Sequence, residues 1–465
     1  MNKGENLILS NEQQEALNEM LKGSNVFLTG KAGTGKSMVV NKFLAQSDKC
    51  VVSLAMSGQA SQNISGQTIH SFFKLPICVM TPEIIQHYTH SKSEILQAVD
   101  VILIDEVSML RQDVFMAMDY ALRKYASPVL KKLPFGGAQI ICVGDPYQLP
   151  PVLASSESEK YFACYDELFV FKSKVWDNAN FKMFNLQKIF RQTDENEINI
   201  LNGIREGHFN YCESYDYYRN MSLEPDSFDK SYIAKLNKLC DLFRPSILTP
   251  LATIICLTNK RAKVINKRRL ALLSSEEFIF KAKHEGIFDE EAKVVENEVI
   301  LKIGAKVMLR HNKRSDDGCV EYVNGDVGFI DCITDYRDDP IVIVRLLDGR
   351  HVAVKRHSWI QHEYDVKTNS YGKKYLVKNE IGSFSQIPLT PAYAITVHKA
   401  QGLTLDQVHL DFGNCFCFCA GQLYVALSRV RSLRKLTLSR PVTDLDVIID
   451  PKAKSFMERF RAARS

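Results

Sequence analysis

Short apolar runs rich in Val, Ile and Leu recur through the first third of the chain. Four of them have the length of a single strand: Val26–Leu28, Val51–Leu54, Val101–Ile104 and Ile140–Val143. Such runs are typical of strands that are buried on both faces of a parallel sheet. The intervening stretches Met38–Gln46 and Asp113–Ala126 favour helices. The pattern therefore predicts an α/β domain with helical crossovers between its strands.

Each of these runs leads directly into small or polar residues. The residues that follow the runs are Thr29–Gly30, Ser57–Gly58, Asp105–Glu106 and Gly144–Asp145. Open parallel sheets bind ligands beyond the carboxyl ends of their strands. We therefore expect these four loops to converge on one site.

A second group of apolar runs predicts a second α/β domain in the C-terminal half. Its members are Thr253–Leu257, Ile395–Lys399, Val408–Phe412 and Leu436–Leu438. The segment Lys302–Gly382 lies between them, is rich in Gly and Asp, and contains short alternating runs, which favours a small β-barrel inserted into the second domain. The stretch Glu213–Asp229 is acidic and aromatic and has no clear period.

The composition is that of a globular protein. Of the 465 residues, 45% are hydrophobic and 24% are charged, which excludes wholesale disorder and a collagen-like or mucin-like chain. At about 150 residues per domain, the length suggests roughly three domains. No segment approaches the ~18 consecutive apolar residues of a membrane helix, and Met1–Ser10 lacks the apolar segment of a secretion signal. We expect a soluble intracellular protein, cytoplasmic and at the nucleoid if its source is a bacterium or a phage, with no signal for a nucleus or a mitochondrion.

Net charge and cysteine content say little about function. Lys and Arg number 59 against 54 Asp and Glu, and the resulting charge of +5 is too small to identify a polyanionic partner. The twelve cysteines mostly stand singly in apolar runs, which favours reduced thiols. In a strand, Cys415, Cys417 and Cys419 would share one face. We do not expect a metal there, because metal sites normally pair ligands two residues apart and add a second cluster.

The segment Gly30–Ser37 has the pattern G-x-x-x-x-G-K-S between a predicted strand and a predicted helix. Gly33, Thr34 and Gly35 lie in this loop, where backbone N–H groups can surround a β-phosphate and the helix N-terminus adds the positive end of its dipole. Lys36 would reach the β- and γ-phosphates, and the Ser37 hydroxyl would bind Mg²⁺. The pattern predicts a site for a nucleoside triphosphate with Mg²⁺.

Asp105 and Glu106 follow the predicted strand at Val101–Ile104. Beside a phosphate-binding loop, Asp105 would hold Mg²⁺ through its water shell and Glu106 would take a proton from the attacking water. The pair is then a Walker B element, which favours hydrolysis over binding alone. The loop Gly144–Pro151 adds Gln148, an uncharged amide, where the γ-phosphate and the water are expected.

Two arginines distinguish a motor protein from a kinase or a nucleotide-dependent switch. A motor needs a second domain that delivers cations to the γ-phosphate, and the candidates are Arg191 and Arg429. A positioned arginine accelerates phosphoryl transfer by about 10³–10⁵. Because Arg429 lies in the second predicted domain, hydrolysis would be tied to closure of the two domains on the triphosphate. Each arginine could instead be a surface ion-pair partner.

In combination and in order, these segments resemble the petite-integration-frequency family of superfamily 1 helicases, which belongs to the 5′-to-3′ branch, with the RecD-type helicases as nearest relatives. The resemblance extends from about Leu9 to Arg440. One departure is Ala55–Gly58, which reads Ala-Met-Ser-Gly where the family has Ala-Pro-Thr-Gly, and the missing proline leaves this loop less rigid. The elements that carry the resemblance are Leu9–Gln13, Gly30–Ser37, Gly66–Phe73, Ile104–Met109, Gly144–Pro151, Phe190–Gln192, Leu257–Asn259, Val323–Gly328, Thr396–Gly402 and Tyr424–Arg429.

The resemblance implies an α/β fold with two RecA-like domains and two insertions. The sequence shows no long N- or C-terminal extension, so we expect a minimal helicase core. The first RecA-like domain would be 1–190 with a wedge insertion near 70–95, the second 191–300 with 384–445, an SH3-like barrel 301–383 and a tail 446–465. Gln13 would read the adenine of ATP, and Gly402 would join Gln148, Arg191 and Arg429 around the γ-phosphate. The residues implied to contact single-stranded DNA are Ser57, His70, Ser71, Phe72, Thr258, Asn259, Thr396, His398 and Lys399.

Clusters of cations favour a nucleic-acid partner independently of the resemblance. Lys260–Arg269 contains six cations and no acid, and Arg429–Lys435 is a second basic run. Such side chains bind phosphate backbones without sequence preference, although either cluster could be a solvated helix face.

We therefore expect an ATP-dependent helicase that moves 5′ to 3′ on single-stranded DNA and unwinds forked or tailed duplexes. Its pathway would be replication, repair, recombination or telomere maintenance. G-quadruplexes, RNA–DNA hybrids and a single-strand binding protein are further candidate partners. Two alternatives stay open: an ATP switch that clamps single strands without unwinding them, and an RNA helicase.

Overall fold

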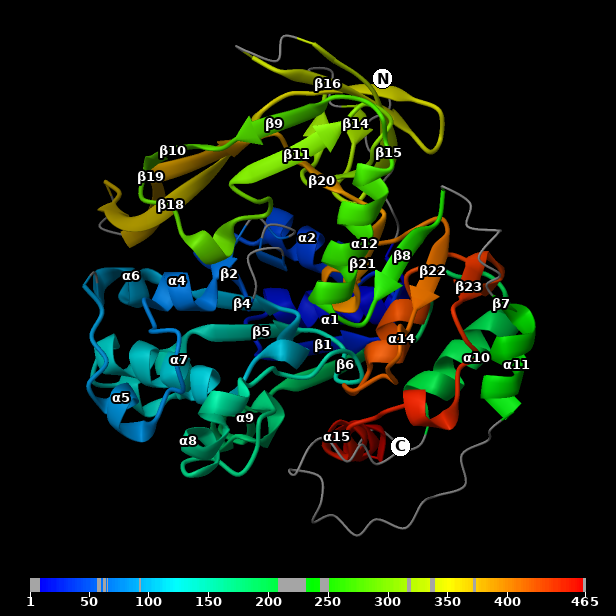
Figure 1. Ribbon diagram of the computed structural model, residues 1–465. Coiled ribbons are helices and arrows are strands. Elements are labelled where there is room, and N and C mark those ends of the chain that lie inside the picture. Colours follow the sequence, from blue (N-terminus) through cyan, green and yellow to red (C-terminus); the bar gives the residue numbers. More distant parts are fainter. Residues whose placement is uncertain are drawn as a thin grey trace. The chain divides into compact units, whose positions relative to one another are not determined.

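The chain divides into two compact units, and their helices and strands are labelled in Figure 1. Unit 1 comprises Met1–Arg191, Glu363–Asn379 and Lys452–Ser465, and unit 2 comprises Gln192–His362 and Glu380–Pro451. The structure is a computed structural model, which describes residues 9–56, 60–61, 64, 66–91, 93–207, 231–242, 251–315, 319–334, 339–370 and 374–462.

Unit 1 is built on a six-stranded sheet in the order β3-β2-β4-β5-β1-β6, and all of its pairs are parallel. The four predicted strands are confirmed as β1, β2, β4 and β5. Because β1 and β4 both flank β5, the loops after these three strands emerge together at one edge. The strand bounds are β1 (Val26–Gly30), β2 (Val51–Ala55), β3 (Gln67–Thr68), β4 (Val101–Asp105), β5 (Gln139–Val143) and β6 (Lys182–Leu186).

Helices with one apolar face pack on this sheet. α1 begins with a capping box, in which Ser10 and Gln13 each bind the other's backbone. Leu17 of α1 and Phe43 of α2 are buried in one cluster with Leu28 of β1. The two helices predicted from the sequence are confirmed as α2 and α7. The helix bounds are α1 (Asn11–Leu21), α2 (Lys36–Gln46), α4 (Ile69–Phe73), α5 (Pro82–Gln86), α6 (Ser93–Ala98), α7 (Gln112–Tyr125), α8 (Ser158–Phe162), α9 (Lys174–Asn178) and α15 (Pro451–Ala462).

Unit 2 contains a second parallel sheet, in the order β21-β8-β22-β23-β7. Its strands are β7 (Asp241–Leu242), β8 (Thr253–Cys256), β21 (Ala394–Thr396), β22 (Val408–Asp411) and β23 (Leu436–Leu438). Its helices are α10 (Glu195–Glu206), α11 (Ser231–Leu239), α12 (Asn259–Ala271), α13 (Val397–Ala400) and α14 (Gln422–Leu427). Parallel pairing in both units agrees with the α/β class expected from the sequence.

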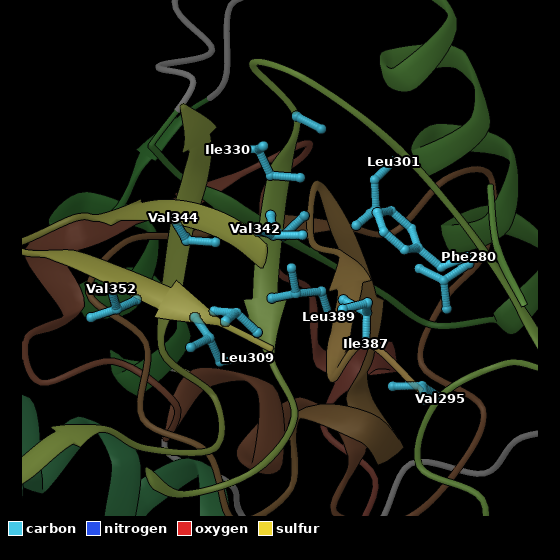
Figure 2. Packing of buried hydrophobic residues seen from close by; sticks show 14 of the residues in the cluster. Phe280, Val295, Leu301, Leu309, Ile330, Val342, Val344, Val352, Ile387 and Leu389 are labelled. Carbon is cyan, nitrogen blue, oxygen red and sulfur yellow. The ribbon is translucent and has the colours of Figure 1, made fainter. Parts of the chain in front are cut away.

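Antiparallel strands occupy the chain between β8 and β21. Five of them form a sheet in the order β17-β16-β15-β12-β20. In β16 every second residue is buried, so one face turns toward a core that includes Val342 and Val344 (Figure 2). The strand bounds are β9 (Glu277–Lys281), β10 (Lys283–Gly286), β11 (Glu298–Lys302), β12 (Lys306–Leu309), β13 (Lys313–Arg314), β14 (Val320–Tyr322), β15 (Val327–Thr334), β16 (Ile341–Leu346), β17 (His351–Val354), β18 (His357–Thr368), β19 (Lys374–Gln386) and β20 (Leu389–Pro391).

One local prediction is wrong. The expected strand Ile395–Lys399 ends at Thr396, because the Thr396 hydroxyl accepts a hydrogen bond from Lys399 N and starts α13. The segment with Cys415, Cys417 and Cys419 is not a strand, and Cys417 N donates to Asp446 Oδ1. The stretch Glu213–Asp229 lies outside the described residues.

The described part of the chain contains neither a membrane-spanning helix nor a cluster of metal ligands. No helix there has both the length and the apolar character needed to cross a bilayer. No group of three or more His, Cys, Asp or Glu side chains in that part is arranged to hold a metal ion.

Candidate functional site

The loop between β1 and α2 has the backbone of a phosphate cradle. Gly33 and Gly35 have φ of +80° and +78°, a region that side chains disfavour, and Gly35 caps the start of α2. Lys36 Nζ donates to Gly30 O at 2.8 Å and to Lys31 O at 3.1 Å, so the ammonium lies across the loop. Ser37 is exposed at the first turn of α2. The helix N-terminus and Lys36 together make this loop suitable for a polyphosphate.

Gln13 and Arg191 flank this loop in unit 1. Gln13 is 1% exposed and its Nε2 donates to Thr34 O at 3.1 Å. A Cβ on Gly33 would lie 2.5 Å from the Arg191 Cβ, and Phe190 N donates to Gly33 O at 2.8 Å. The segment around Arg191 is therefore held directly against the glycine loop.

Asp105 and Glu106 stand at the carboxyl end of β4. Burial and the neighbouring Glu106 raise the pKa of Asp105 to about 7, an effect that Lys36 partly offsets. Lys36 is therefore within electrostatic reach of Asp105. Glu106 has φ of +50° and donates its N–H to Asp105 Oδ1 at 2.9 Å. This left-handed residue turns the chain sharply where the strand ends.

The loop after β5 closes against both neighbouring strands. Gly144 N donates to Leu28 O at 3.1 Å, and a Cβ on Gly144 would lie 3.0 Å from Val107 N. Gln148 follows in this loop, is 7% exposed, and donates its N–H to Asp145 O. Three of the four loops predicted to converge, those after β1, β4 and β5, thus lie together, whereas Ser57–Gly58 lies outside the described residues.

Two buried hydroxyls beside these loops lack hydrogen-bond partners. They are Thr29 Oγ1, next to Gly30, and Ser108 Oγ, two residues after Glu106. An unsatisfied buried hydroxyl costs free energy unless a ligand or a water completes it. Together with the oxygen donors Ser37 and Asp105, these groups fit a nucleotide with a hard cation such as Mg²⁺.

Gly402 and Arg429 come together within unit 2. Arg429 is 2% exposed, which is not the position of a surface ion-pair partner. Its guanidinium donates to the carbonyls of Ala400 and Leu403, which flank Gly402, both at 3.4 Å. It also donates to Val425 O at 2.7 Å and Ser428 Oγ at 2.6 Å. The arginine is therefore fixed by its own unit.

A threonine-capped helix follows the edge strand of each parallel sheet. In unit 1, Thr68 accepts from Ser71 N at 3.2 Å and begins the sequence Thr-Ile-His70. In unit 2, Thr396 accepts from Lys399 N at 3.4 Å and begins Thr-Val-His398. Burial lowers the pKa of His398. The two units thus present the same cap, followed two residues later by a histidine, at equivalent strand ends.

The predicted DNA residues that follow β8 lie at the start of α12, beside α13. Thr258 accepts from Arg261 N at 3.3 Å and starts α12 at Asn259. Because β8 and β21 are neighbours with Cys256 opposite Thr396, the caps of α12 and α13 start side by side. Arg261 is paired with Asp411 at 2.8 Å, while Lys260 and Lys267 are exposed.

Residues 8–210 of the chain match the family model of PIF1-like helicases. The ATP-dependent DNA helicase Pif1 of Bdellovibrio bacteriovorus is 30% identical, and the match covers 97% of this chain and 92% of that protein. The chain belongs to the PIF1-like helicase family. It is also 31% identical to the ATP-dependent DNA helicase PIF1 of Xenopus laevis over 92% of this chain, and it spans 61% of that relative's length.

Solved structures of the family have the same fold. Bacteroides Pif1 in complex with ADP-AlF4 is 31% identical, has a TM-score of 0.81, and the match covers 98% of both chains. Bacteroides Pif1 in complex with ADP-AlF3 and single-stranded DNA is 31% identical with a TM-score of 0.66, again over 98% of both chains. Membership in the PIF1-like family confirms the prediction of an ATP-dependent DNA helicase.

The predicted site residues fall into four groups, one of which is His70, Ser71 and Phe72 in α4 of unit 1. Unit 1 brings together Gln13, Gly33, Thr34, Gly35, Lys36, Ser37, Asp105, Glu106, Gln148 and Arg191 around one loop edge. Unit 2 brings Gly402 to Arg429, and Thr258 and Asn259 to Thr396, His398 and Lys399. Ser57 lies outside the described residues.

Phe72 occupies a buried position in unit 1. It is 4% exposed and packs edge-on against Phe73 and Tyr364, with ring centroids 5.0 and 5.4 Å apart. A cavity of about 410 Å³ lies nearby in the same segment, lined in part by Lys74, Met80 and Tyr88. The ring of Phe72 therefore supports the residues around it, and a direct contact with DNA stays a prediction.

Sequence reasoning missed the residue that anchors the arginine segment of unit 2. Glu197 of α10 is 2% exposed and accepts from Ser432 Oγ at 2.8 Å and Leu433 N at 2.6 Å. Gln192 Nε2 donates to Val430 O at 2.8 Å. Ser432 and Leu433 are far from Glu197 in the chain, so no local sequence pattern could have identified Glu197. Gln192 belongs to the motif Phe190–Gln192, but nothing in the sequence indicated a role for it.

Proposed function

We propose that this PIF1-like helicase moves 5′ to 3′ on single-stranded DNA, driven by ATP hydrolysis in unit 1. The observation that carries the proposal is the convergence of Lys36, Asp105 and Arg191 on one glycine loop. The polarity follows from the family that the chain resembles. Bacteroides Pif1 in complex with a nucleotide analogue and single-stranded DNA supports the same two ligands for this chain.

Each residue of the nucleotide site has a proposed task. Gln13, fixed to Thr34 O, reads the adenine edge, and the N–H groups of Gly33–Ser37 bind phosphate. Ser37 and Asp105 would hold Mg²⁺, which neutralises charge that develops on the phosphates. Glu106 accepts the proton of the attacking water while Gln148 orients it. Arg191, with Arg429 and Gly402 of unit 2, completes the γ-phosphate set.

The DNA track is proposed to use the capped helices of both units. His70 and Ser71 in unit 1 and Thr258, Asn259, Thr396, His398 and Lys399 in unit 2 contact the strand. Ser57 and Phe72 are the other residues proposed to contact the strand. Backbone contacts of this kind bind without sequence preference and weaken with salt.

We assign these tasks to the domains expected from the sequence. Residues 1–190 form the first RecA-like domain with a duplex-splitting wedge near 70–95, and residues 191–300 with 384–445 form the second. Residues 301–383 form the SH3-like insertion and 446–465 the tail. Forked or tailed duplexes are the proposed substrates, with G-quadruplexes, RNA–DNA hybrids and a single-strand binding protein as further partners, in replication, repair, recombination or telomere maintenance.

Strand displacement from tailed duplexes tests the proposal. We expect ATP-dependent release from a duplex with a 5′ single-stranded tail and none from one with a 3′ tail. Lys36→Ala should reduce hydrolysis by about 10²–10³ and unwinding with it, because an ammonium placed at the phosphates is lost. Lys42→Ala on the same helix is the matched control.

Other results of the strand-displacement experiment would contradict specific parts of the proposal. Release from the 3′ tail alone would reverse the polarity. DNA-stimulated hydrolysis without release from either substrate would mean a clamp rather than a motor. Unwinding that survives Lys36→Ala would overturn the site assignment.

A further inference from the structure

α12 carries a set of cations that the proposed function does not use. The helix contains no acidic residue. Ala262 is buried, and Asn266 binds both Ala394 O at 2.7 Å and Ala394 N at 2.8 Å, so this face of α12 is fixed against the parallel sheet of unit 2. The remaining turns of the helix expose four cations to solvent, which are Lys260, Lys263, Lys267 and Arg268.

These four cations lack the partner that another cation of the same helix has. Arg261 Nε pairs with Asp411 Oδ2 at 2.8 Å. Among the described residues, none of the four exposed side chains takes part in an ion pair or a hydrogen bond. Lys263 lies three positions after Lys260 and four before Lys267, spacings at which like charges face each other and destabilise a helix. This face is therefore unfavourable for α12 alone and becomes favourable when an anion joins it.

The cationic face begins at the proposed DNA track. Thr258 caps α12, and Asn259 is its first residue. Because β8 and β21 are paired in parallel, the cap of α13 starts beside the cap of α12. A single strand bound at the two caps therefore lies within one helical turn of Lys260 and Lys263.

The spacing of the cations suits a nucleic-acid backbone. An α-helix rises about 1.5 Å per residue, so Lys263 and Lys267 are separated by about 6 Å along the axis of α12. A row of cations at such a spacing can follow a single strand from one phosphate to the next. No aromatic residue lies in α12, so this face offers the bases no ring on which to stack.

We propose that the exposed face of α12 binds backbone phosphates of the single strand where the strand continues beyond the caps of α12 and α13. The proposal rests on the proposed DNA track and extends it by Lys260, Lys263, Lys267 and Arg268. These contacts hold the strand without reading its sequence, because they involve phosphates alone.

Lys263→Gln/Lys267→Gln tests the proposal, because both side chains are exposed and the loss of charge leaves the packing of α12 intact. Affinity is measured by fluorescence anisotropy over a series of KCl concentrations. The probes are two fluorescein-labelled oligothymidylates, one of about 8 nucleotides for the caps alone and one of about 16. For the longer probe we expect about tenfold weaker binding near 0.1 M KCl and a salt slope smaller by about 1.4, the value for two phosphate contacts. Affinity for the shorter probe should stay within about twofold of the wild type.

Lys131→Gln/Lys132→Gln is the matched control. It changes the net charge equally at two exposed lysines of unit 1 that precede β5, and it should bind both probes as the wild type does. Lys263→Arg/Lys267→Arg keeps the charge and should also retain wild-type affinity and slope. The Tm of Lys263→Gln/Lys267→Gln should stay equal or rise, because repulsion within α12 is removed.

Four results would overturn the proposal. They are unchanged binding of the longer probe, equal losses for both probes, an equal loss in the Lys131→Gln/Lys132→Gln control, and weaker binding of a blunt duplex alone, which would assign the face to duplex DNA. Failure of the wild-type chain to bind either oligothymidylate would instead reject the proposed DNA track.

Discussion

Hydrogen bonds within unit 2 hold the Arg429 side chain in place without a bound nucleotide. Four hydrogen bonds from its guanidinium end on Val425 O, Ala400 O, Leu403 O and Ser428 Oγ. A guanidinium fixed in this way loses little conformational entropy when it meets a phosphate. The same bonds stabilise the turn at Gly402, so the side chain has a structural role as well as the proposed catalytic one.

Arg429→Lys should separate these two roles. Lysine keeps the positive charge but loses the planar guanidinium and its paired N–H donors. An arginine contributes about 10³–10⁵ to the rate of phosphoryl transfer, so we expect turnover to fall by up to about 10³ in this charge-conserving variant. ATP affinity, measured with a fluorescent ATP analogue, should change little, because the loop of unit 1 supplies most phosphate contacts.

Arg431→Lys is the control for this experiment, since Arg431 is exposed two residues further on. Tm is measured for both variants. Equal loss of ATP affinity and turnover in Arg429→Lys would contradict the proposed role, and wild-type turnover would reject it. A large fall in Tm alone would assign Arg429 to stability.

At the scale of residues, the sequence reveals chemistry that is local in the chain. Lys36 and Asp105 could be identified because each lies in a motif that follows an apolar run within a few residues. The contact between Gly33 and Arg191, and the anchoring of Leu433 by Glu197, join residues more than a hundred positions apart. Such contacts depend on how the sheets assemble, which no local pattern encodes.

Among the elements, α4 and α13 are unusual because each is short and depends on one threonine. An isolated helix of five or four residues is unstable in water, so the cap and the adjoining strand must hold it. The hydroxyls of Thr68 and Thr396 therefore set the direction of His70 and His398.

Thr396→Ala should cost about 1 kcal/mol of stability, the usual loss for a helix cap, and should weaken single-strand binding several-fold because Lys399 loses its fixed position. Thr68→Ala should act the same way in unit 1. Chemical denaturation and anisotropy with oligothymidylate measure the two effects, and the serine variants should restore both.

Ser173→Ala provides the control for this pair, since Ser173 caps α9 by accepting from Trp176 N at 3.2 Å. It should lower stability by a similar amount and leave DNA affinity unchanged. Capping variants that lose stability but bind DNA as wild type would contradict a role of α4 and α13 in the track.

Strand prediction succeeded for the apolar runs of the two parallel sheets and for the alternating runs within Lys302–Gly382, which include β16 and β17, but it missed several other strands. The runs that became β1, β4, β5 and β8 are buried along their whole length or nearly so. The edge strand β6, half exposed over Met183–Asn185, was missed. The short alternating strands β9 to β11 were missed as well, because charged residues interrupt their apolar positions.

At the scale of the whole chain, Lys306 links stability to pH. It is fully buried, and its ammonium donates to Leu251 O at 2.7 Å and Ala252 O at 2.8 Å, next to the start of β8. Burial, with a smaller effect of Arg269, lowers its pKa from 10.5 to about 7. Between these two values the unfolded chain binds a proton that the folded chain does not.

This difference predicts that Lys306 makes the free energy of unfolding rise with pH from about 7 toward 10, because the unfolded state binds more protons over that range. Below about pH 7 the lysine is charged in both states and contributes no slope. Lys306→Met removes the titrating group, so its Tm should rise less with pH than that of the wild type. Lys302→Met is the control for loss of a lysine that donates to a carbonyl, here Leu273 O at 3.1 Å. Parallel Tm curves for the wild type and Lys306→Met between pH 7 and 10 would show that Lys306 does not titrate there.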